Sequence, residues 1–156
     1  NLLKSMLLAF FIISVIMSLL FKNIKMVIIS LIPNIIPLII AGGIMGYFNI
    51  PLKPSSALVF SIVFGISVDY SIHFLAKFKN ELLNKNLEDS IIETINQTGR
   101  SMIFTSFILF FGFIIFAFSN FGGTIILGVL TSVILFVAMI TNLTLLPSII
   151  LHFYKK

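Results

Sequence analysis

The chain has 156 residues, of which 59% are hydrophobic and 10% charged, and its formal net charge is +5. A soluble domain has about a quarter charged residues, so this composition, with a mean hydropathy of +1.19, excludes an ordinary soluble protein and predicts an integral membrane protein. The basic residues are scattered between apolar segments, which argues against a nucleic-acid partner, and the absence of cysteine excludes disulfides and thiolate metal sites.

Five apolar segments are long enough to cross a bilayer, which takes about 20 helical residues. We expect these spans at residues 2–21, 26–48, 55–76, 101–119 and 124–150. The pattern predicts an all-α fold, a polytopic membrane bundle of five transmembrane helices that forms a single transmembrane domain over residues 1–156. Pro33 and Pro37 lie inside the second span. Each removes a backbone donor, so they predict a kink or a local opening of that helix.

The polar segment 77–100 separates the third and fourth spans and is expected to be a cytoplasmic loop. Asn86 predicts a helix N-cap, with Asp89 at the capping-box position, and Gly99 predicts the helix end. Apolar residues recur every four positions, at Leu83, Leu87, Ile91 and Ile95. They predict a short amphipathic helix on the membrane surface. Its function is open between a simple connection of two spans and a coupling or docking role.

The basic residues are distributed unequally between the two predicted sides of the membrane. One side holds Lys4 and Lys53, and the other holds Lys22, Lys25, Lys77, Lys79, Lys85, Arg100, Lys155 and Lys156. The positive-inside rule then places the C-terminus in the cytoplasm and the N-terminus outside the cell. We expect a multi-pass protein of the cell (inner or plasma) membrane. An outside N-terminus without a signal sequence also predicts that the chain is a fragment of a longer protein.

Asp69 is the only carboxylate inside an apolar span. A charge at membrane depth costs roughly 2.5–3.5 kcal/mol on insertion scales, so such a residue indicates a functional site. Residues four apart share a helix face, and the face of Asp69 also carries Ala57, Ser61, Gly65 and His73. Small residues at this spacing allow close helix packing. We therefore expect Gly65 and Ser61 to pack against another helix, and Asp69 to point at it.

Two neighbours of Asp69 are candidates for a proton relay with it. His73 lies one turn closer to the cytoplasm and can bond to Asp69 or pass protons. Tyr70 lies about 100° around the helix and carries a hydroxyl that needs a partner when buried. The alternatives are structural: a static buried acid for Asp69, an interfacial side chain for His73, and packing for Tyr70.

Polar residues on other spans are further candidates. Thr105 and Ser106 on the fourth span can hydrogen-bond to Asp69, and Asn34, between two prolines, is expected to line a cavity at a broken helix. Simple helix packing is the alternative for Thr105 and Ser106. No enzyme is expected, because membrane aspartyl proteases need two carboxylates and a metal site needs at least three ligands. The sequence predicts no catalytic residue, no metal and no cofactor.

The stretch Gly65-Ile66-Ser67-Val68-Asp69-Tyr70 resembles the G-x-x-x-D-Y motif of the resistance–nodulation–division (RND) superfamily, in its MMPL and Patched-like branch. Residues 32–37, 98–106, 111–113 and 145–148 extend the resemblance in the same order over nearly the whole chain. Members of the superfamily have twelve transmembrane helices in two similar halves. The resemblance implies that this chain is the last five helices of one half, and we favour the C-terminal half.

The resemblance also implies a function, an exporter of lipids or other hydrophobic compounds that is driven by the proton-motive force. Asp69 would bind the proton, with Tyr70 as its relay partner. The implied partners are the other transmembrane half, the extracytoplasmic domains, membrane lipids and a hydrophobic substrate, and a homo-oligomer is left open. The alternative function is a sterol-sensing-like domain, which binds lipid and regulates partners without transport.

Overall fold

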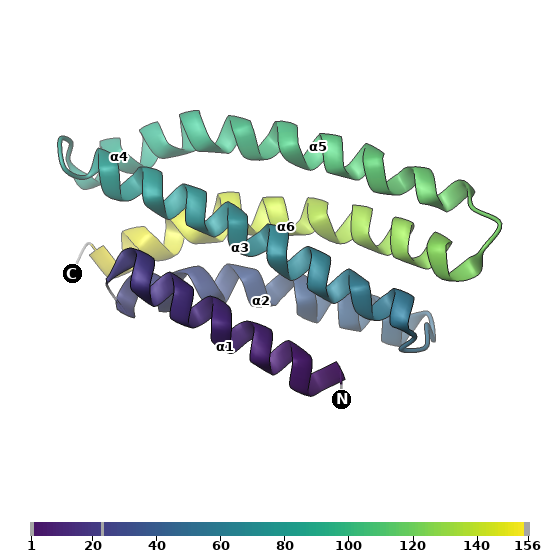
Figure 1. Ribbon diagram of the computed structural model, residues 1–156. Coiled ribbons are helices and arrows are strands. Elements are labelled where there is room, and N and C mark those ends of the chain that lie inside the picture. Colours follow the sequence, from purple (N-terminus) through teal and green to yellow (C-terminus); the bar gives the residue numbers. More distant parts are fainter. Residues whose placement is uncertain (1, 23, 155–156) are drawn as a thin grey trace.

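The structure is a computed structural model that describes the backbone of residues 2–22 and 24–154, and the side chains of these residues except 2–7, 9, 10, 20 and 24. All elements within these residues are helical, which confirms the predicted all-α fold (Figure 1). In chain order they are α1 (Leu2–Phe21), α2 (Ile24–Tyr47), α3 (Pro54–Glu81), α4 (Leu87–Thr94), the π-helical segment η1 (Ile95–Gly99), α5 (Arg100–Ile114), the 3-10 segment η2 (Ile115–Phe118) and α6 (Gly122–Tyr154).

Four helices are long and apolar enough to cross a membrane, and they match the second to fifth predicted spans. They are Lys25–Tyr47, Pro54–Glu81, Leu87–Phe118 and Gly122–Tyr154. The chain is therefore part of a multi-pass membrane protein. Helix α1 coincides with the first predicted span, 2–21, and its crossing of the membrane stays a prediction.

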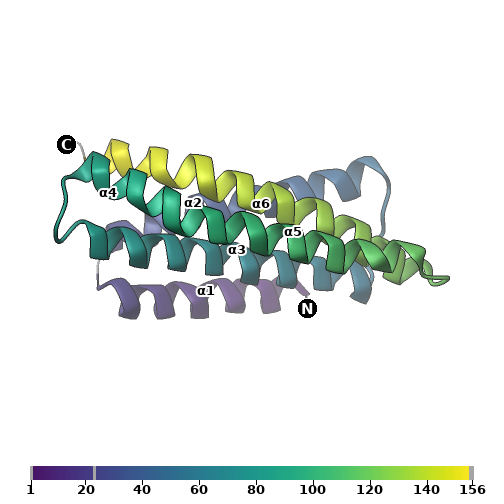
Figure 2. The same cartoon turned by 90° about the horizontal axis from the view of Figure 1, so that it is seen from above.

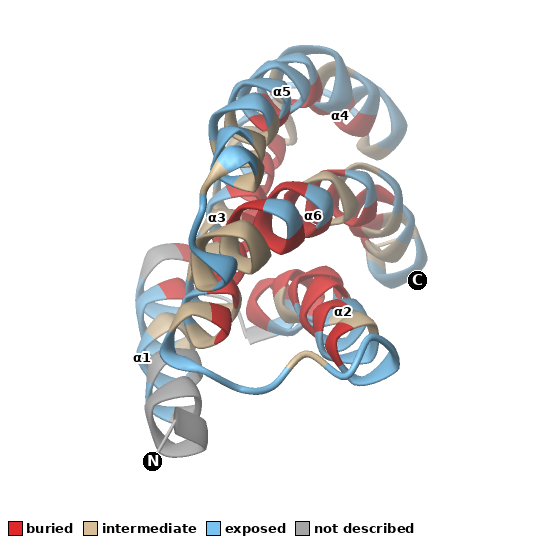
Figure 3. Cartoon of the chain, turned by 90° about the vertical axis from the view of Figure 1, so that its right-hand side faces the viewer, coloured by how far each residue is buried: buried red, intermediate tan, exposed pale blue. Residues whose placement is uncertain are grey.

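The long helices lie side by side with their axes nearly aligned (Figures 1 and 2). Helix α6 lies at the centre and packs against α2, α3 and α5. Helix α1 packs on the outside of α2 and α3, and Figure 3 shows it at the edge of the bundle, away from α5. The buried faces of α2, α3 and α6 point at one another, so these three helices form the apolar core.

Helix α3 is longer than the predicted span 55–76 and begins at a proline, Pro54. Proline is favoured at the first helical position because its missing N–H needs no partner there, and the side chain of Ser56 accepts a hydrogen bond from the backbone N–H of Lys53 at 2.8 Å. At its other end the helix extends to Glu81, whose carboxylate lies 2.7 Å from Lys77 Nζ. This ion pair between residues four apart stabilises the helix beyond residue 76, where the apolar span was expected to end.

The polar segment 77–100 contains the short helix that was predicted in it, α4, and only residues 82–86 are non-helical. Its place on the cytoplasmic side stays a prediction. Asn86 caps α4 as predicted, since its side chain accepts the backbone N–H of Asp89 at 2.9 Å. Across this turn, Lys85 Nζ lies 2.8 Å from Glu81. That hydrogen bond raises the pKa of the Lys85 ammonium above its ordinary value.

Gly99 does not end a helix, which corrects the predicted stop. Its backbone is helical (φ −60°, ψ −41°), and the chain continues from α4 through η1 into α5. A Cβ at Gly99 would lie 3.2 Å from Leu143 Cδ2 of α6, so the glycine serves a close approach between helices. Ile91 of the predicted amphipathic face is buried in the core, whereas Ile95 is exposed. The placement of α4 on the membrane surface stays a prediction.

Helix α2 does not open at its two prolines, so the expected local opening is wrong, and the expected kink stays a prediction. It is helical without a break from Ile24 to Tyr47, although Pro33 and Pro37 lie inside it. Both prolines are buried in the bundle. Neighbouring helices can re-satisfy backbone groups that a proline frees in a membrane helix, and α3 and α6 both pack against α2 here.

Candidate functional site

The predicted polar stripe lies on one face of α3, and this face points away from the core. Ser61, Gly65, Asp69 and His73 are all exposed, and the side chains of Asp69 and His73 are 62% and 69% accessible. The opposite face of α3 is buried against α2 and α6 and carries Val59, Val63, Ser67, Ser71, Phe74 and Phe78. Among the described residues no helix covers the stripe, so the packing of Asp69 against another helix stays a prediction.

Asp69 and His73 lie next to each other on this face. Asp69 Oδ1 is 3.4 Å from His73 Nε2, as their four-residue spacing predicts. The contact is an ion pair when the imidazole is protonated and places a proton donor or acceptor beside the carboxylate. The arrangement is one that a relay requires, and the relay itself stays a prediction.

A groove of about 660 Å³ runs beside Asp69, between α3 and the continuous helix α4–η1–α5. Most of the side chains that line it are polar. From α3 these are Asp69, Tyr70, His73, Ala76, Lys77 and Asn80, and from the facing helix they are Gln97, Thr98, Ser101, Met102 and Thr105. Thr105 therefore shares a groove with Asp69, Tyr70 and His73, although it lies on a different helix.

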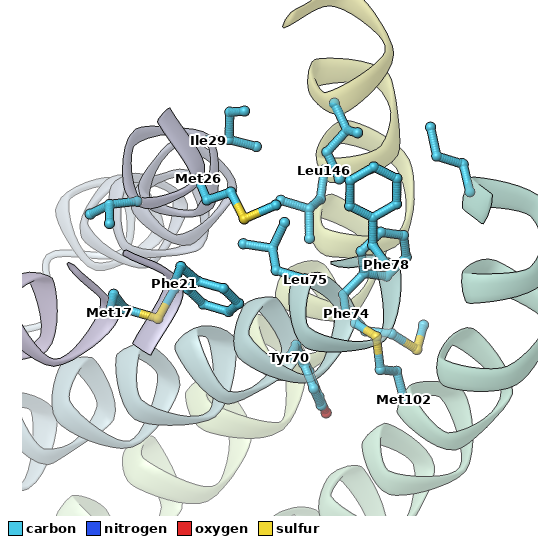
Figure 4. Close-up of a cluster of buried hydrophobic side chains, with 14 residues drawn as sticks. Met17, Phe21, Met26, Ile29, Tyr70, Phe74, Leu75, Phe78, Met102 and Leu146 are labelled. Atoms are coloured by element: carbon cyan, nitrogen blue, oxygen red, sulfur yellow. The ribbon is translucent and has the colours of Figure 1, made fainter. Parts of the chain in front are cut away.

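Tyr70 connects the stripe to α5 through its hydroxyl group. The ring of Tyr70 belongs to a buried cluster with Phe74 and Met102, and Figure 4 shows its oxygen pointing away from the other labelled side chains. Tyr70 Oη lies 2.6 Å from Ser106 Oγ, and both residues are buried. Ser106 was expected to hydrogen-bond to Asp69, but its partner is Tyr70. The hydroxyl of Tyr70 has the partner that burial requires.

Asn34 lies on the other side of α3, in a buried polar cluster with Ser67, Ser71 and Asn142. Its Oδ1 accepts hydrogen bonds from Ser67 Oγ at 2.7 Å and Ser71 Oγ at 3.0 Å. Ser71 Oγ also lies 2.7 Å from Asn142 Oδ1, and Asn142 Nδ2 donates to Ser67 Oγ at 3.1 Å. All four residues are fully buried. Asn34 is therefore enclosed between helices, and its expected place at a cavity stays a prediction.

This cluster joins three helices at a single level of the bundle. Asn34 is on α2, Ser67 and Ser71 are on α3, and Asn142 is on α6. The signal in the sequence was the four-residue spacing of Ser67 and Ser71, on the face of α3 opposite the stripe. Asn34 Nδ2 is buried without a hydrogen-bond partner. A rotation of α3 would also take the hydroxyl groups of Ser67 and Ser71 away from their partners on α2 and α6. Buried polar groups without partners are costly. The cluster therefore favours the rotational setting of α3 in which Asp69 points outward.

Replacement of Asn142 with Ala is expected to weaken this junction. The change removes donors and an acceptor that Ser67 and Ser71 use, and interhelical hydrogen bonds in membranes contribute about 0.6 kcal/mol on average and about 1.7 at most. We expect a lower midpoint of thermal unfolding for the full-length protein in detergent. Thr144→Ala is the control, because the exposed Thr144 hydroxyl bonds only to Ile140 O of its own helix. Equal midpoints for the two variants would contradict the role of the cluster.

The chain is similar to known proteins along nearly its whole length. The sequence profile of the MMPL family matches residues 1–153. A membrane protein of Methanocaldococcus jannaschii is 31% identical over 124 residues, which are 79% of this chain and 32% of that protein. The aligned region therefore spans about a third of the relative's length. No solved structure matches the chain.

Proposed function

Because the chain belongs to the MMPL family, we propose that it is the transmembrane part of a proton-driven exporter of lipids or other hydrophobic compounds, in which Asp69 binds the proton. The observation that carries the proposal is a carboxylate on the open face of a membrane-spanning helix, 3.4 Å from a histidine. Ionisable residues inside membrane spans are rare and face protein or water. A proton that crosses the membrane releases about 2.3 kcal/mol per 100 mV, which is energy that can drive transport.

The open stripe of α3 is the surface on which the proposed second transmembrane half packs. An exposed Asp69 would be costly against lipid, so this face needs a protein or water neighbour. A Cβ at Gly65 would meet nothing within 4 Å, and Ser61 next to it is also exposed. Small residues of this kind allow a second helix to approach closely.

The decisive experiment is export by the full-length protein that carries Asp69→Asn. The substitution keeps the shape of the side chain and removes its ability to bind a proton. Loss of export supports the proposal, and undiminished export would contradict it.

The role of Tyr70 can be tested with a pair of variants that break the same hydrogen bond. Tyr70→Phe and Ser106→Ala each remove the 2.6 Å contact between the two hydroxyls, but only the first removes the tyrosine hydroxyl. If that hydroxyl takes part in the relay, Tyr70→Phe lowers the export rate about tenfold or more, since a hydrogen bond to a charged group contributes about 1.5–3 kcal/mol. Ser106→Ala is expected to have a much smaller effect. Equal losses in export would show that the contact only anchors α5.

A further inference from the structure

The turn between α1 and α2 carries two exposed lysines, Lys22 and Lys25. Lys22 directly follows the last residue of α1 and has a positive φ of 49°, and Lys25 lies in the first turn of α2. Three residues of backbone span at most about 11 Å, and lysine carries its charge on a flexible four-carbon stem. Both ammonium groups can therefore contact a single anion.

A third exposed lysine, Lys79, lies on the side of α3 that faces this turn. It follows Leu75 by four residues and so shares its helix face. Leu75 belongs to one buried cluster with Phe21 and Met26, and Figure 4 shows the three side chains together. Phe21 and Met26 are the sequence neighbours of the two turn lysines. The packing of this cluster therefore brings all three lysines, the basic cluster, to one corner of the bundle.

The carboxylates of the chain lie away from this corner or have other partners. Residues 1–68 contain no Asp or Glu. Glu81, two residues after Lys79, pairs with Lys77 at 2.7 Å and with Lys85 at 2.8 Å, and residues two apart on a helix do not face each other. Within the described part of the chain, Lys22 and Lys79 have no ion-pair partner. Their charges are available to an anion from outside the chain.

Exposed apolar side chains continue from both turn lysines along the outer faces of α1 and α2. They recur at intervals of three or four residues, so each set forms one ridge along its helix. All are at least 40% exposed, and they are Ile12, Val15 and Leu19 on α1, and Ile28, Ile32 and Ile35 on α2. Lys25 lies three residues before Ile28 and heads the ridge of α2. The basic cluster thus borders apolar surface that acyl chains can cover.

Positive charge at the edge of an apolar surface fits an anionic phospholipid. Its phosphate supplies the negative charge, and its acyl chains extend along the ridges. Basic pockets between membrane helices bind headgroups of this kind. The orientation of the chain requires basic residues on this side of the membrane, but it does not require three of them at one corner. A free phosphate would use the lysines and leave the ridges uncovered.

We propose that Lys22, Lys25 and Lys79 bind the headgroup of an anionic phospholipid, of which phosphatidylglycerol is an example, at the α1–α2 turn. The lipid is a bound component of the surrounding bilayer. The site does not include Asp69 and does not depend on proton-driven export.

Native mass spectrometry of the full-length protein in a neutral detergent tests the site. It measures the dissociation constant of the first phosphatidylglycerol that binds. Lys22→Gln, Lys25→Gln and Lys79→Gln are each expected to weaken binding about fivefold, the usual contribution of one basic residue near an anionic membrane surface.

Arg100→Gln is the matched control. It removes the same charge from an exposed residue at the start of α5, and α1 lies at the edge of the bundle away from α5 (Figure 3). We expect this variant to bind phosphatidylglycerol as the unmodified protein does. Equal weakening by Arg100→Gln and the three lysine variants would overturn the site, because a general attraction between basic side chains and anionic lipid would then explain the binding.

Two further ligands identify which part of the lipid is recognised. Phosphatidylcholine, which has no net charge, is expected to bind more weakly than phosphatidylglycerol and equally to all variants, which also shows that the variants are folded. Glycerol phosphate, the headgroup without chains, is expected not to displace bound phosphatidylglycerol at equal concentration. Equal affinity of the unmodified protein for the two lipids would overturn the ionic recognition, and displacement by glycerol phosphate would overturn the assignment to a lipid.

Discussion

Asp69→Asn in the full-length protein is expected to abolish concentrative, proton-driven export and to leave the protein folded in the membrane. Asn has nearly the same shape as Asp but is neutral and takes up no proton. The proton gradient then no longer acts on the protein. At about 2.3 kcal/mol per 100 mV, and about 1.4 kcal/mol for each factor of ten, the accumulation ratio falls by about 50-fold for each 100 mV of membrane potential.

The measurement uses proteoliposomes with an imposed proton gradient. Proton influx is followed with a pH-sensitive dye inside the vesicles, and export is followed with a fluorescent lipid analogue. Asp89→Asn is the control, because it removes the same charge from an exposed position on α4, outside the groove. Only Asp69→Asn is expected to lose proton influx and export. If the Asp69→Asn protein moves no protons but still regulates a partner in response to lipid, the sterol-sensing-like function is favoured.

Gly128→Ala is expected to destabilise the bundle where α5 and η2 lie against α6. A Cβ at Gly128 would lie 2.5 Å from Phe116 Cβ and 2.6 Å from the backbone carbonyl oxygen of Phe113. Neither atom is the end of a flexible side chain, so the helices themselves must separate. Overpacking of this kind costs about 1–3 kcal/mol. The expected result is a lower midpoint of thermal unfolding for the full-length protein in detergent.

A glycine on the partner helix provides the control for this prediction. A Cβ at Gly112 of α5 would meet nothing within 4 Å, so Gly112→Ala is expected to leave the midpoint unchanged or to raise it slightly, since alanine is the better helix former. If both alanine variants lower the midpoint equally, the close contact at Gly128 is not what holds α5 to α6. Export is not needed for this comparison.

The helices and the polar stripe could be predicted from the sequence because both depend on local spacing. Long apolar runs indicated the spans, and the four-residue interval placed Asp69 and His73 on one face, where they lie 3.4 Å apart. Asn86 was predicted as a cap from its type and position, and it caps α4. These features need only the geometry of one helix.

Polar composition was a poor guide to where helices end. The polar segment 77–100 contains charged residues that extend α3 and start α4, so only residues 82–86 are non-helical. Gly99 was expected to stop a helix, yet it lies within a continuous one and allows a close approach to Leu143. A change from apolar to polar residues marks the edge of a membrane span, which is a different boundary from the end of hydrogen-bonded helix.

By itself, the sequence determined that this protein is a bundle of membrane helices with one carboxylate on a face of small residues, because hydropathy and helical periodicity are properties of single segments. Only the tertiary structure decided which groups from different helices meet. It paired Tyr70 with Ser106, enclosed Asn34 with Asn142, and left the face of Asp69 open beside a groove. These contacts depend on the rotation and separation of packed helices, which follow from side-chain packing across the whole bundle and not from any one segment.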